Sequence, residues 1–218
     1  MKTYLTLCFI LFALPSWAEV CKFRYNYFDF YEPTRYIYKN YENGKKEGTW
    51  IIKQDDIILS RQSYKNDKLE GYSIEYSLSH SLTFFCKPIK VRKLKSHGYY
   101  RNNKKDGFWK YYNNGMIYSK GFYKDGKKEG LWNFYYSTGA DFYNGHFKNN
   151  RKEGVWVNYY LDGTIRSKRS YSEGKKDGEW VWYQEDGKTA SKGIYINGIK
   201  EGKWRYYKSN GTLKEHIS

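Results

Sequence analysis

Basic residues recur in pairs at regular intervals, and this spacing makes them the first candidates for binding chemistry. The pairs consist of Lys104, Lys105, Lys127, Lys128, Arg151, Lys152, Lys175 and Lys176. Cations held in a row could bind anionic lipid headgroups, polyanionic glycans or an acidic protein. The alternative is a role in solubility, because Glu or Asp follows each pair and charged turns discourage association between sheet edges. The formal net charge of +16 favours anionic partners without identifying one.

Catalytic chemistry has weaker support in the sequence. The histidines His80, His97, His146 and His216 share no repeat position and lack metal-ligand spacing. The acidic residues recur at equal intervals, whereas an enzyme needs one unique site. We therefore expect a protein that is not an enzyme and has neither a cofactor nor a bound metal. A hydrolase with its site around His80, Cys86 and His97 is a further hypothesis.

A repeat of about 24 residues must position the basic pairs. Seven glycines between residues 48 and 202 close Lys-rich links, and they are separated by 23, 36, 23, 24, 24 and 24 residues. Self-similarity at such a period is typical of a repeat array, in which each unit buries its apolar face against its neighbours. The interval of 36 residues contains an insertion at about residues 77–90.

Each repeat has the pattern of a β-hairpin. In the five copies from Gly107 onward, a tryptophan comes two residues after the closing glycine and a tyrosine three residues later. The two earlier copies are degraded, with Lys53 at the Tyr position and Ser73 at the Trp position. The first column is Trp109, Trp132, Trp156, Trp180 and Trp204, and the second is Tyr112, Tyr135, Tyr159, Tyr183 and Tyr207. In a strand, residues three apart point to opposite faces, so each column should have its own face. Turn signals such as Asn114-Gly115 follow each first strand.

The hairpins should form one extended sheet. An aromatic content of 21% with few aliphatic residues suits a thin sheet covered by flat rings. We predict an all-β fold, an elongated single-layer antiparallel meander in which each Trp meets its equivalents in adjacent copies. Gly121, Gly145 and Gly193 recur in the second strands, which predicts that a neighbouring aromatic ring lies across the bare backbone.

The pattern Gly-x-Trp-x-x-Tyr-Tyr-x-x-Gly, followed by Tyr-x-x-Gly-Lys-Lys-x-Gly, resembles the MORN-repeat variant family. The resemblance covers about residues 36–218. It implies tandem β-hairpins in a long curved sheet, a scaffold that binds other molecules, and no catalytic residues. The family includes bacterial proteins labelled as YwqK-type antitoxins, so the resemblance also implies an antitoxin or immunity-type role as an alternative.

The first residues predict export. A basic start, an apolar run and the small-x-small ending at Ala18 indicate a signal peptide over residues 1–18. The apolar run is too short for a transmembrane anchor, so no membrane span should remain after cleavage. Residues 19–35 would form an N-terminal cap before the array at 36–218. Cys21 and Cys86 would then form one disulfide between the cap and the insertion, or remain two free thiols.

These features favour an exported, periplasmic or secreted scaffold that binds another macromolecule, most simply a protein. The alternative is a peripheral binder of anionic envelope lipid or polysaccharide. An aromatic face left open by a single-layer sheet is a second candidate surface for protein or carbohydrate. Nucleic acid is disfavoured as a partner because export separates the protein from it, although alternating aromatic and basic residues resemble a stacking groove.

Overall fold

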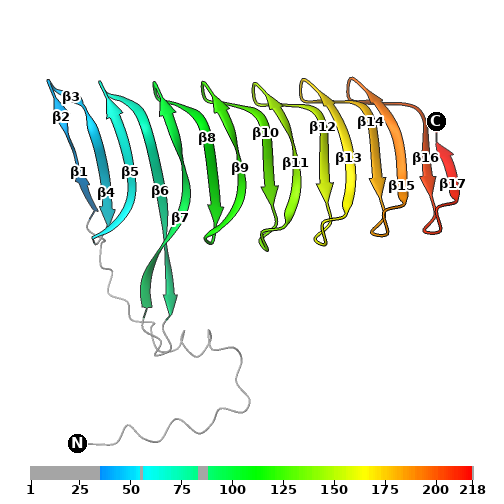
Figure 1. Cartoon of the computed structure of the whole chain (residues 1–218), viewed down its shortest axis with the longest axis horizontal. Coiled ribbons are helices and arrows are strands. Elements are labelled where there is room, and N and C mark those ends of the chain that lie inside the picture. The colour runs from blue at the N-terminus through cyan, green and yellow to red at the C-terminus, as the bar shows by residue number, and fades with distance from the viewer. Residues whose placement is uncertain (1–34, 55, 83–87, 218) are drawn as a thin grey trace, which may run out of the picture.

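The described residues form one long antiparallel sheet. The computed structural model describes residues 35–54, 56–82 and 88–217. Fifteen strands follow one another in the order β1-β4-β5 and then in sequence to β17, and β2 and β3 form a separate two-stranded ribbon. Figure 1 shows the hairpins side by side in a single layer, with bowed strands. The predicted all-β meander is confirmed. Within these residues no helix is long and apolar enough to cross a membrane.

The strands are short in the repeats and long at the insertion. The first nine are β1 (Arg35–Tyr38), β2 (Tyr41–Glu42), β3 (Lys45–Lys46), β4 (Gly48–Gln54), β5 (Ile57–Lys65), β6 (Lys68–Leu82), β7 (Pro88–Arg101), β8 (Lys104–Asn113) and β9 (Met116–Lys124). The others are β10 (Lys127–Tyr135), β11 (Asp141–Lys148), β12 (Arg151–Tyr159), β13 (Ile165–Ser172), β14 (Lys175–Tyr183), β15 (Thr189–Ile196), β16 (Ile199–Tyr207) and β17 (Leu213–Ile217).

Turns of two kinds close the two edges of the sheet. Along the edge that we call the basic edge, both central residues of each turn have positive φ, as in Asn102 (48°) and Asn103 (64°). Such two-residue turns match the right-handed twist of the flanking strands. Along the other edge the four loops after residue 135 are longer, and a glycine such as Gly163 (φ 88°) takes the left-handed position. The Asn114-Gly115 turn on that edge is again a two-residue turn of positive φ (49° and 85°). Because successive turns lie at alternate edges, the chain returns to the basic edge once in every repeat.

The closing glycine of each repeat lies at a β-bulge. Gly130 has a φ of 66°, and the register between β10 and β9 shifts between Glu129 and Trp132. A glycine accepts this conformation without strain, and the extra residue increases the local twist. Each basic pair lies in the strand just before the bulge, so its two side chains point to opposite faces.

The tryptophans form the core on one face of the sheet, which we call the tryptophan face. Trp132 and Trp156 are each 1% exposed. A Cβ on Gly121 would lie 2.3 Å from the ring of Trp132, and one on Gly145 would lie 2.3 Å from Trp156. The prediction that a ring lies across the second-strand glycines is confirmed. The indole Nε1 of Trp132 also donates a hydrogen bond to the carbonyl oxygen of Phe122, at 3.0 Å.

The aromatic ladder alternates between two kinds of ring, which corrects the expectation that each Trp meets other tryptophans of its column. Trp132 packs edge-on against Tyr123 at 5.1 Å and against Phe147 at 6.1 Å. Trp156 makes the same contact with Phe147 at 5.0 Å. First strands of adjacent hairpins are two strand spacings apart, about 10 Å, which is too far for ring contact. The ring of the intervening strand fills that space.

The insertion lengthens one hairpin. Residues 77–82 of β6 and 88–93 of β7 pair with each other and extend past the neighbouring strands, and Figure 1 shows this hairpin projecting from the edge opposite the basic edge. The predicted signal peptide, nearly all of the predicted cap, Cys21 and Cys86 lie outside the described residues.

Candidate binding face

The structure divides each basic pair between the two faces of the sheet. The ammonium group of Lys128 lies 4.3 Å from the centroid of the Trp132 ring, on the tryptophan face. The second members of the other pairs repeat this contact, at 4.3 Å for Lys105 with Trp109, 4.3 Å for Lys152 with Trp156, and 4.8 Å for Lys176 with Trp180. These four ammonium groups are engaged in cation–π contacts inside the sheet.

Burial acts on three of these lysines. It lowers the pKa of Lys105, Lys128 and Lys152, because the charged form loses hydration. Lys105 also donates a hydrogen bond to the Tyr111 hydroxyl at 2.7 Å. The second lysines therefore cover the tryptophans, and this contact leaves them poorly placed to bind a partner.

The first member of each pair points to the opposite face, because neighbouring residues of a strand alternate. There it meets another cation across the strand pair. Four successive turns carry such pairs: Lys65 with Lys68, Arg101 with Lys104, Lys124 with Lys127, and Lys148 with Arg151. All eight residues are exposed, and we call them the cation row. Like charges directly opposite one another destabilise a sheet, so the row is an unfavourable feature of the isolated protein.

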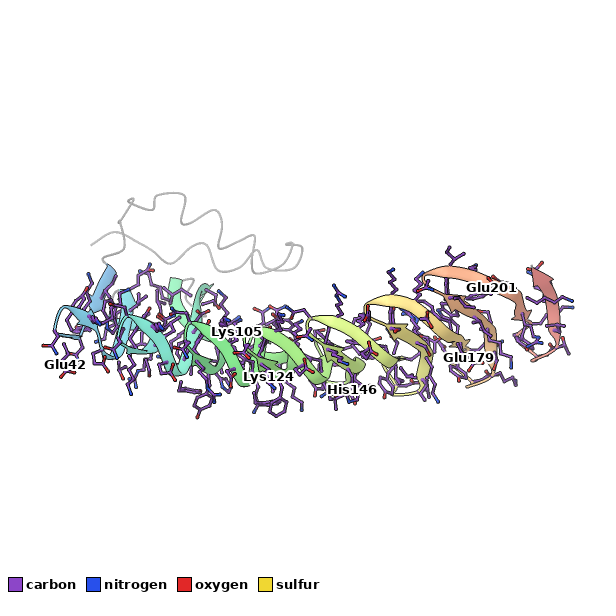
Figure 2. The ribbon with its side chains drawn as sticks, turned by 90° about the horizontal axis from the view of Figure 1, so that it is seen from above. Glu42, Lys105, Lys124, His146, Glu179 and Glu201 are labelled. Atoms are coloured by element: carbon purple, nitrogen blue, oxygen red, sulfur yellow. The ribbon has the colours of Figure 1, made fainter. Side chains whose placement is uncertain are left out.

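The cation row ends before the last repeats. At the next two turns the corresponding pairs are Ser172 with Lys175 and Ile196 with Ile199. The array is therefore asymmetric along its length, and its C-terminal repeats lack the paired cations. Figure 2 shows Lys105 and Lys124 in the middle of the ribbon, and Glu179 and Glu201 toward its C-terminal end.

The acidic residues that follow the pairs do not neutralise most of this charge. The Glu129 carboxylate accepts a hydrogen bond from the Asn149 backbone N–H at 3.0 Å, in the turn of the next repeat. The same contact recurs for Glu47, Glu70, Asp106, Glu153 and Asp177, at 2.9 to 3.5 Å. Among the described residues, carboxylates form ion pairs with two members of the cation row, Arg101 with Asp106 and Arg151 with Glu173. The carboxylates thus join one repeat to the next.

Exposed apolar side chains lie beside the cation row on the same face. Phe122 and Lys124 are two residues apart on β9, on either side of Tyr123, which faces Trp132. The apolar stripe, as we call it, consists of Tyr99 (54% exposed), Phe108 (37%), Phe122 (53%), Leu131 (45%) and Val155 (51%). The rings of Phe108 and Phe122 are 4.9 Å apart. The cation row and the apolar stripe together form what we call the binding face.

The tyrosine column lies on this face and contacts the preceding hairpin. The Tyr112 hydroxyl is 3.1 Å from His97 Nε2, and Tyr159 accepts a hydrogen bond from Asn144 at 3.3 Å. Tyr135 lies under the ammonium group of Lys120 at 5.2 Å. Tyr112, Tyr135, Tyr159, Tyr183 and Tyr207 are all partly buried, so they support the sheet from this side.

The residues of the hydrolase hypothesis are only partly described. Burial, followed by the charge of Lys110, lowers the pKa of His97, whose ring stacks on Tyr112. The side chain of His80 and the whole of Cys86 lie outside the described residues. Within the described part of the chain, no group of three or more His, Cys, Asp or Glu residues could hold a metal ion.

Five members of the cation row were not candidates from the sequence. These are Lys65, Lys68, Arg101, Lys124 and Lys148. A usable signal was present, because a basic residue directly follows the aromatic residue of four links, as in Tyr123-Lys124. The sequence does not show that this basic residue lies opposite the first cation of the next strand, because that contact depends on the cross-strand register, as for Lys124 and Lys127.

The repeat pattern agrees with a known family. The profile of the MORN repeat variant matches residues 110–125, 152–173, 176–197 and 200–218. These matches cover strands from both the middle and the C-terminal end of the sheet. No curated protein matches the chain.

Proposed function

The repeats within residues 110–218 belong to the MORN repeat variant family, and on that premise we propose that the protein is a non-enzymatic scaffold that binds an acidic partner protein through the binding face. The observation that carries this proposal is the placement of four cross-strand cation pairs beside an exposed apolar stripe. Partners that meet such a surface present carboxylates opposite the cations and apolar side chains opposite the stripe.

The energetics favour a bound state. Carboxylates placed between like-charged partners such as Lys124 and Lys127 would replace repulsion by attraction. Covering Phe122 and its neighbours would remove apolar surface from water, at about 25 cal/mol per Å². Steering by the positive row would also raise the association rate at low salt.

Affinity capture with matched variants tests this proposal. The wild-type protein, a Phe122→Ser/Lys124→Glu/Lys127→Glu variant and a Lys175→Glu/Lys203→Glu control are used as baits. Captured proteins are identified by mass spectrometry, and direct binding is then measured with each purified candidate. We expect one acidic protein to bind the wild type and the control, and to bind the triple variant at least tenfold more weakly. Equal binding to all three baits would contradict the proposal.

A second candidate function is peripheral binding to anionic envelope lipid or polysaccharide. It is favoured by the regular repetition of the cation pairs, since a charged surface contributes about 1 kcal/mol per nearby Lys or Arg without needing a shaped partner. Sedimentation with phosphatidylglycerol and phosphatidylcholine vesicles separates the two. Salt-sensitive binding to phosphatidylglycerol alone, lost in the triple variant, would favour the lipid surface over a protein.

We also infer export and one disulfide from the sequence. Cleavage after Ala18 and a Cys21–Cys86 bond are both read by mass spectrometry of non-reduced protein from the cell envelope and the medium. Recovery of the uncleaved chain from the cytoplasm, or of two free thiols, would contradict them. An antitoxin or immunity-type role would be a special case of protein binding, and it requires that co-expression with the captured partner rescues growth.

A further inference from the structure

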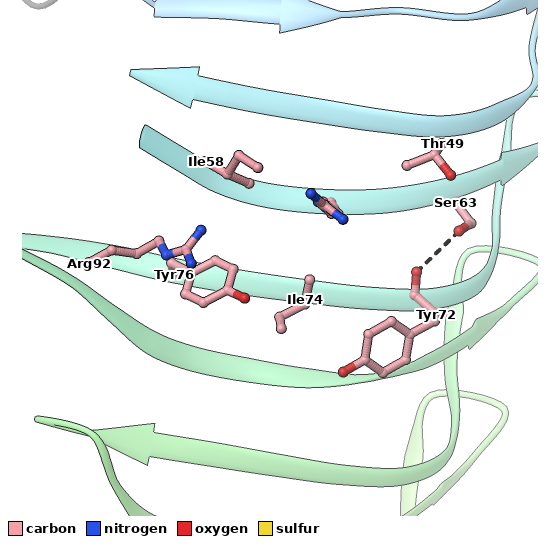
Figure 3. A pocket seen from close by; sticks show the side chains of 8 residues that line it. Thr49, Ile58, Ser63, Tyr72, Ile74, Tyr76 and Arg92 are labelled. Atoms are coloured by element: carbon pink, nitrogen blue, oxygen red, sulfur yellow. Dashed lines mark hydrogen bonds between the residues drawn. The ribbon is translucent and has the colours of Figure 1, made fainter. Parts of the chain in front are cut away.

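A depression on the binding-face side of the sheet lies at the N-terminal end of the apolar stripe. It has a volume of about 440 Å³ and is lined by Thr49, Ile58, Arg61, Ser63, Tyr72, Ile74, Tyr76 and Arg92. Figure 3 shows Tyr72, Ile74 and Tyr76 along β6, with Ile58 and Thr49 on the neighbouring strands. Its volume is within the range of small-ligand sites, roughly 300–1,000 Å³.

Small side chains open this depression. Thr49 precedes Trp50 just as Leu131 precedes Trp132, and Ser63 precedes Tyr64 just as Phe122 precedes Tyr123. At these two positions the middle repeats carry the members of the apolar stripe, whereas His146, Ser170, Glu179 and Lys203 occupy them elsewhere. The first repeats carry hydroxyl groups instead. At the N-terminal end of the apolar stripe, the smaller side chains therefore leave room for the depression, whose wall carries the hydroxyl groups of Thr49 and Ser63.

The insertion supplies the second feature of the site. Because it lengthens the hairpin of β6 and β7, Arg92 lies opposite Leu78, beyond the point where an ordinary repeat would turn. The Arg92 guanidinium lies 4.1 Å from the centroid of the Tyr76 ring. Among the described strands no other repeat has such an extension, so the site differs from the rest of a regular array.

The charge of the depression is uncompensated. Arg61 and Arg92 are both exposed, and no carboxylate is among its lining residues. None of the ion pairs between described residues involves either guanidinium. Two forked donors beside aromatic rings and hydroxyl groups form a site for an anionic ligand with a flat apolar face.

We propose that this depression binds a carboxylated pyranose, a sugar acid of an acidic polysaccharide. The carboxylate would accept hydrogen bonds from Arg61 and Arg92. The apolar face of the ring would cover Tyr72 and the isoleucines, and the sugar hydroxyls would bond to Ser63 and Thr49. An acidic peptide side chain would use the two arginines but leave the rings and hydroxyls unused. This site goes beyond the protein-binding function proposed above.

Calorimetry with the full chain tests the proposal, with trigalacturonate as the probe and neutral maltotriose beside it. The variants are Arg61→Gln/Arg92→Gln and, as a matched control, Arg205→Gln, an exposed arginine of the same face in a C-terminal repeat. We expect trigalacturonate to bind the wild type and the control, the double variant to bind at least tenfold more weakly, and maltotriose not to bind. Thermal unfolding of each variant checks that the fold is retained.

Other outcomes would overturn the assignment. Equal binding of trigalacturonate to the double variant would place its site elsewhere. Hexaglutamate that binds as tightly as trigalacturonate, and through the same two arginines, would make this a peptide site. The Lys124→Glu/Lys127→Glu change is on β9 and β10, three and four strands from Tyr72 and Ile74 of β6. That is at least about 14 Å, which is more than the Debye length of about 8 Å in physiological salt. This double change should leave trigalacturonate binding unchanged, so the two proposals can fail separately.

Discussion

The indole ring of Trp132 lies against the bare Cα of Gly121, the residue directly opposite it on β9. A Cβ at position 121 would lie 2.3 Å from Cδ2 and 2.4 Å from Cε2 of the indole. The ring is 1% exposed although the sheet is a single layer. A small residue on one strand and a large one on the next therefore give this thin sheet its core.

Replacing Gly121 with alanine should destabilise the protein. The methyl group would push Trp132 out of its position, and overpacking of this kind costs roughly 1–3 kcal/mol. Urea denaturation followed by tryptophan fluorescence measures the change. The control is Lys124→Ala, an exposed position on the same strand, which should stay within about 0.5 kcal/mol of wild type. A Gly121→Ala variant as stable as this control would contradict the packing described.

The two residues of one basic pair should respond differently to alanine. Lys128→Ala removes a cation and an aliphatic stem from the Trp132 ring, which should cost about 1 kcal/mol of unfolding free energy. Lys127→Ala removes an exposed charge opposite Lys124 and should leave stability unchanged or slightly higher. Parallel denaturation curves compare the two variants. Equal losses of unfolding free energy in the two variants would contradict the placement of Lys127 and Lys128 on opposite faces.

The contact between Glu129 and the next turn should stabilise that turn. Glu129→Ala removes the acceptor for the Asn149 N–H, and loss of a charge-assisted bond costs roughly 1–2 kcal/mol. Hydrogen exchange should be faster at Asn149 and its neighbours. Glu129→Gln should restore part of the protection, and Glu179→Ala, at an exposed strand position, should have no effect on that turn. Unchanged exchange at Asn149 in Glu129→Ala would exclude the contact.

Alkaline unfolding should depend on Tyr111. Burial, followed by its hydrogen bond to Tyr123, raises the pKa of Tyr111 above the ordinary value of 10.0. The unfolded chain therefore loses this proton first, and the unfolding free energy falls as pH rises above 10. The lowered pKa of Lys105 has the opposite effect on the unfolding free energy. At pH values just below 10.5 the unfolded chain binds more protons at this lysine than the folded chain does, so this contribution to stability rises with pH.

Tyr111→Phe isolates this contribution, since Lys105 stays in place. Denaturation curves at several alkaline pH values should show a smaller fall in stability for Tyr111→Phe than for the wild type. Tyr207→Phe, in the C-terminal repeat, is the control and should keep the wild-type slope, because Tyr111 and the rings around it are unchanged. Identical slopes for wild type and Tyr111→Phe would place the ionising group elsewhere.

The spacing of glycines and aromatic residues within each repeat was enough to predict the fold. In the five repeats from Gly107 onward a tryptophan follows the glycine by two residues, and a tyrosine follows the tryptophan by three. Residues three apart in a strand point to opposite faces, so the two rings must lie on different faces of the sheet. Gly121 and Gly145 likewise predicted a ring on the neighbouring strand, since few other environments favour glycine inside a strand. Both inferences use contacts within one hairpin or between adjacent strands.

The candidate site was predicted less well, because its residues meet across the sheet. From the sequence alone Lys127 and Lys128 had equal roles. In the structure the bulge at Gly130 brings Lys128 over Trp132, and strand alternation leaves Lys127 on the other face. The pairing of Lys124 with Lys127 depends on a two-residue turn of positive φ, and the place of Arg92 depends on the length of the β6–β7 hairpin.

By itself, the sequence determined the period, the hairpins and the two columns of rings, because strand alternation acts between near neighbours. Only the tertiary structure decided which cations face outward together and which cover tryptophans. It also decided where the stripe opens into a hollow lined by Arg61 and Arg92. Those relationships join residues of different strands, and the register that brings them together is set by bulges, turns and contacts between repeats.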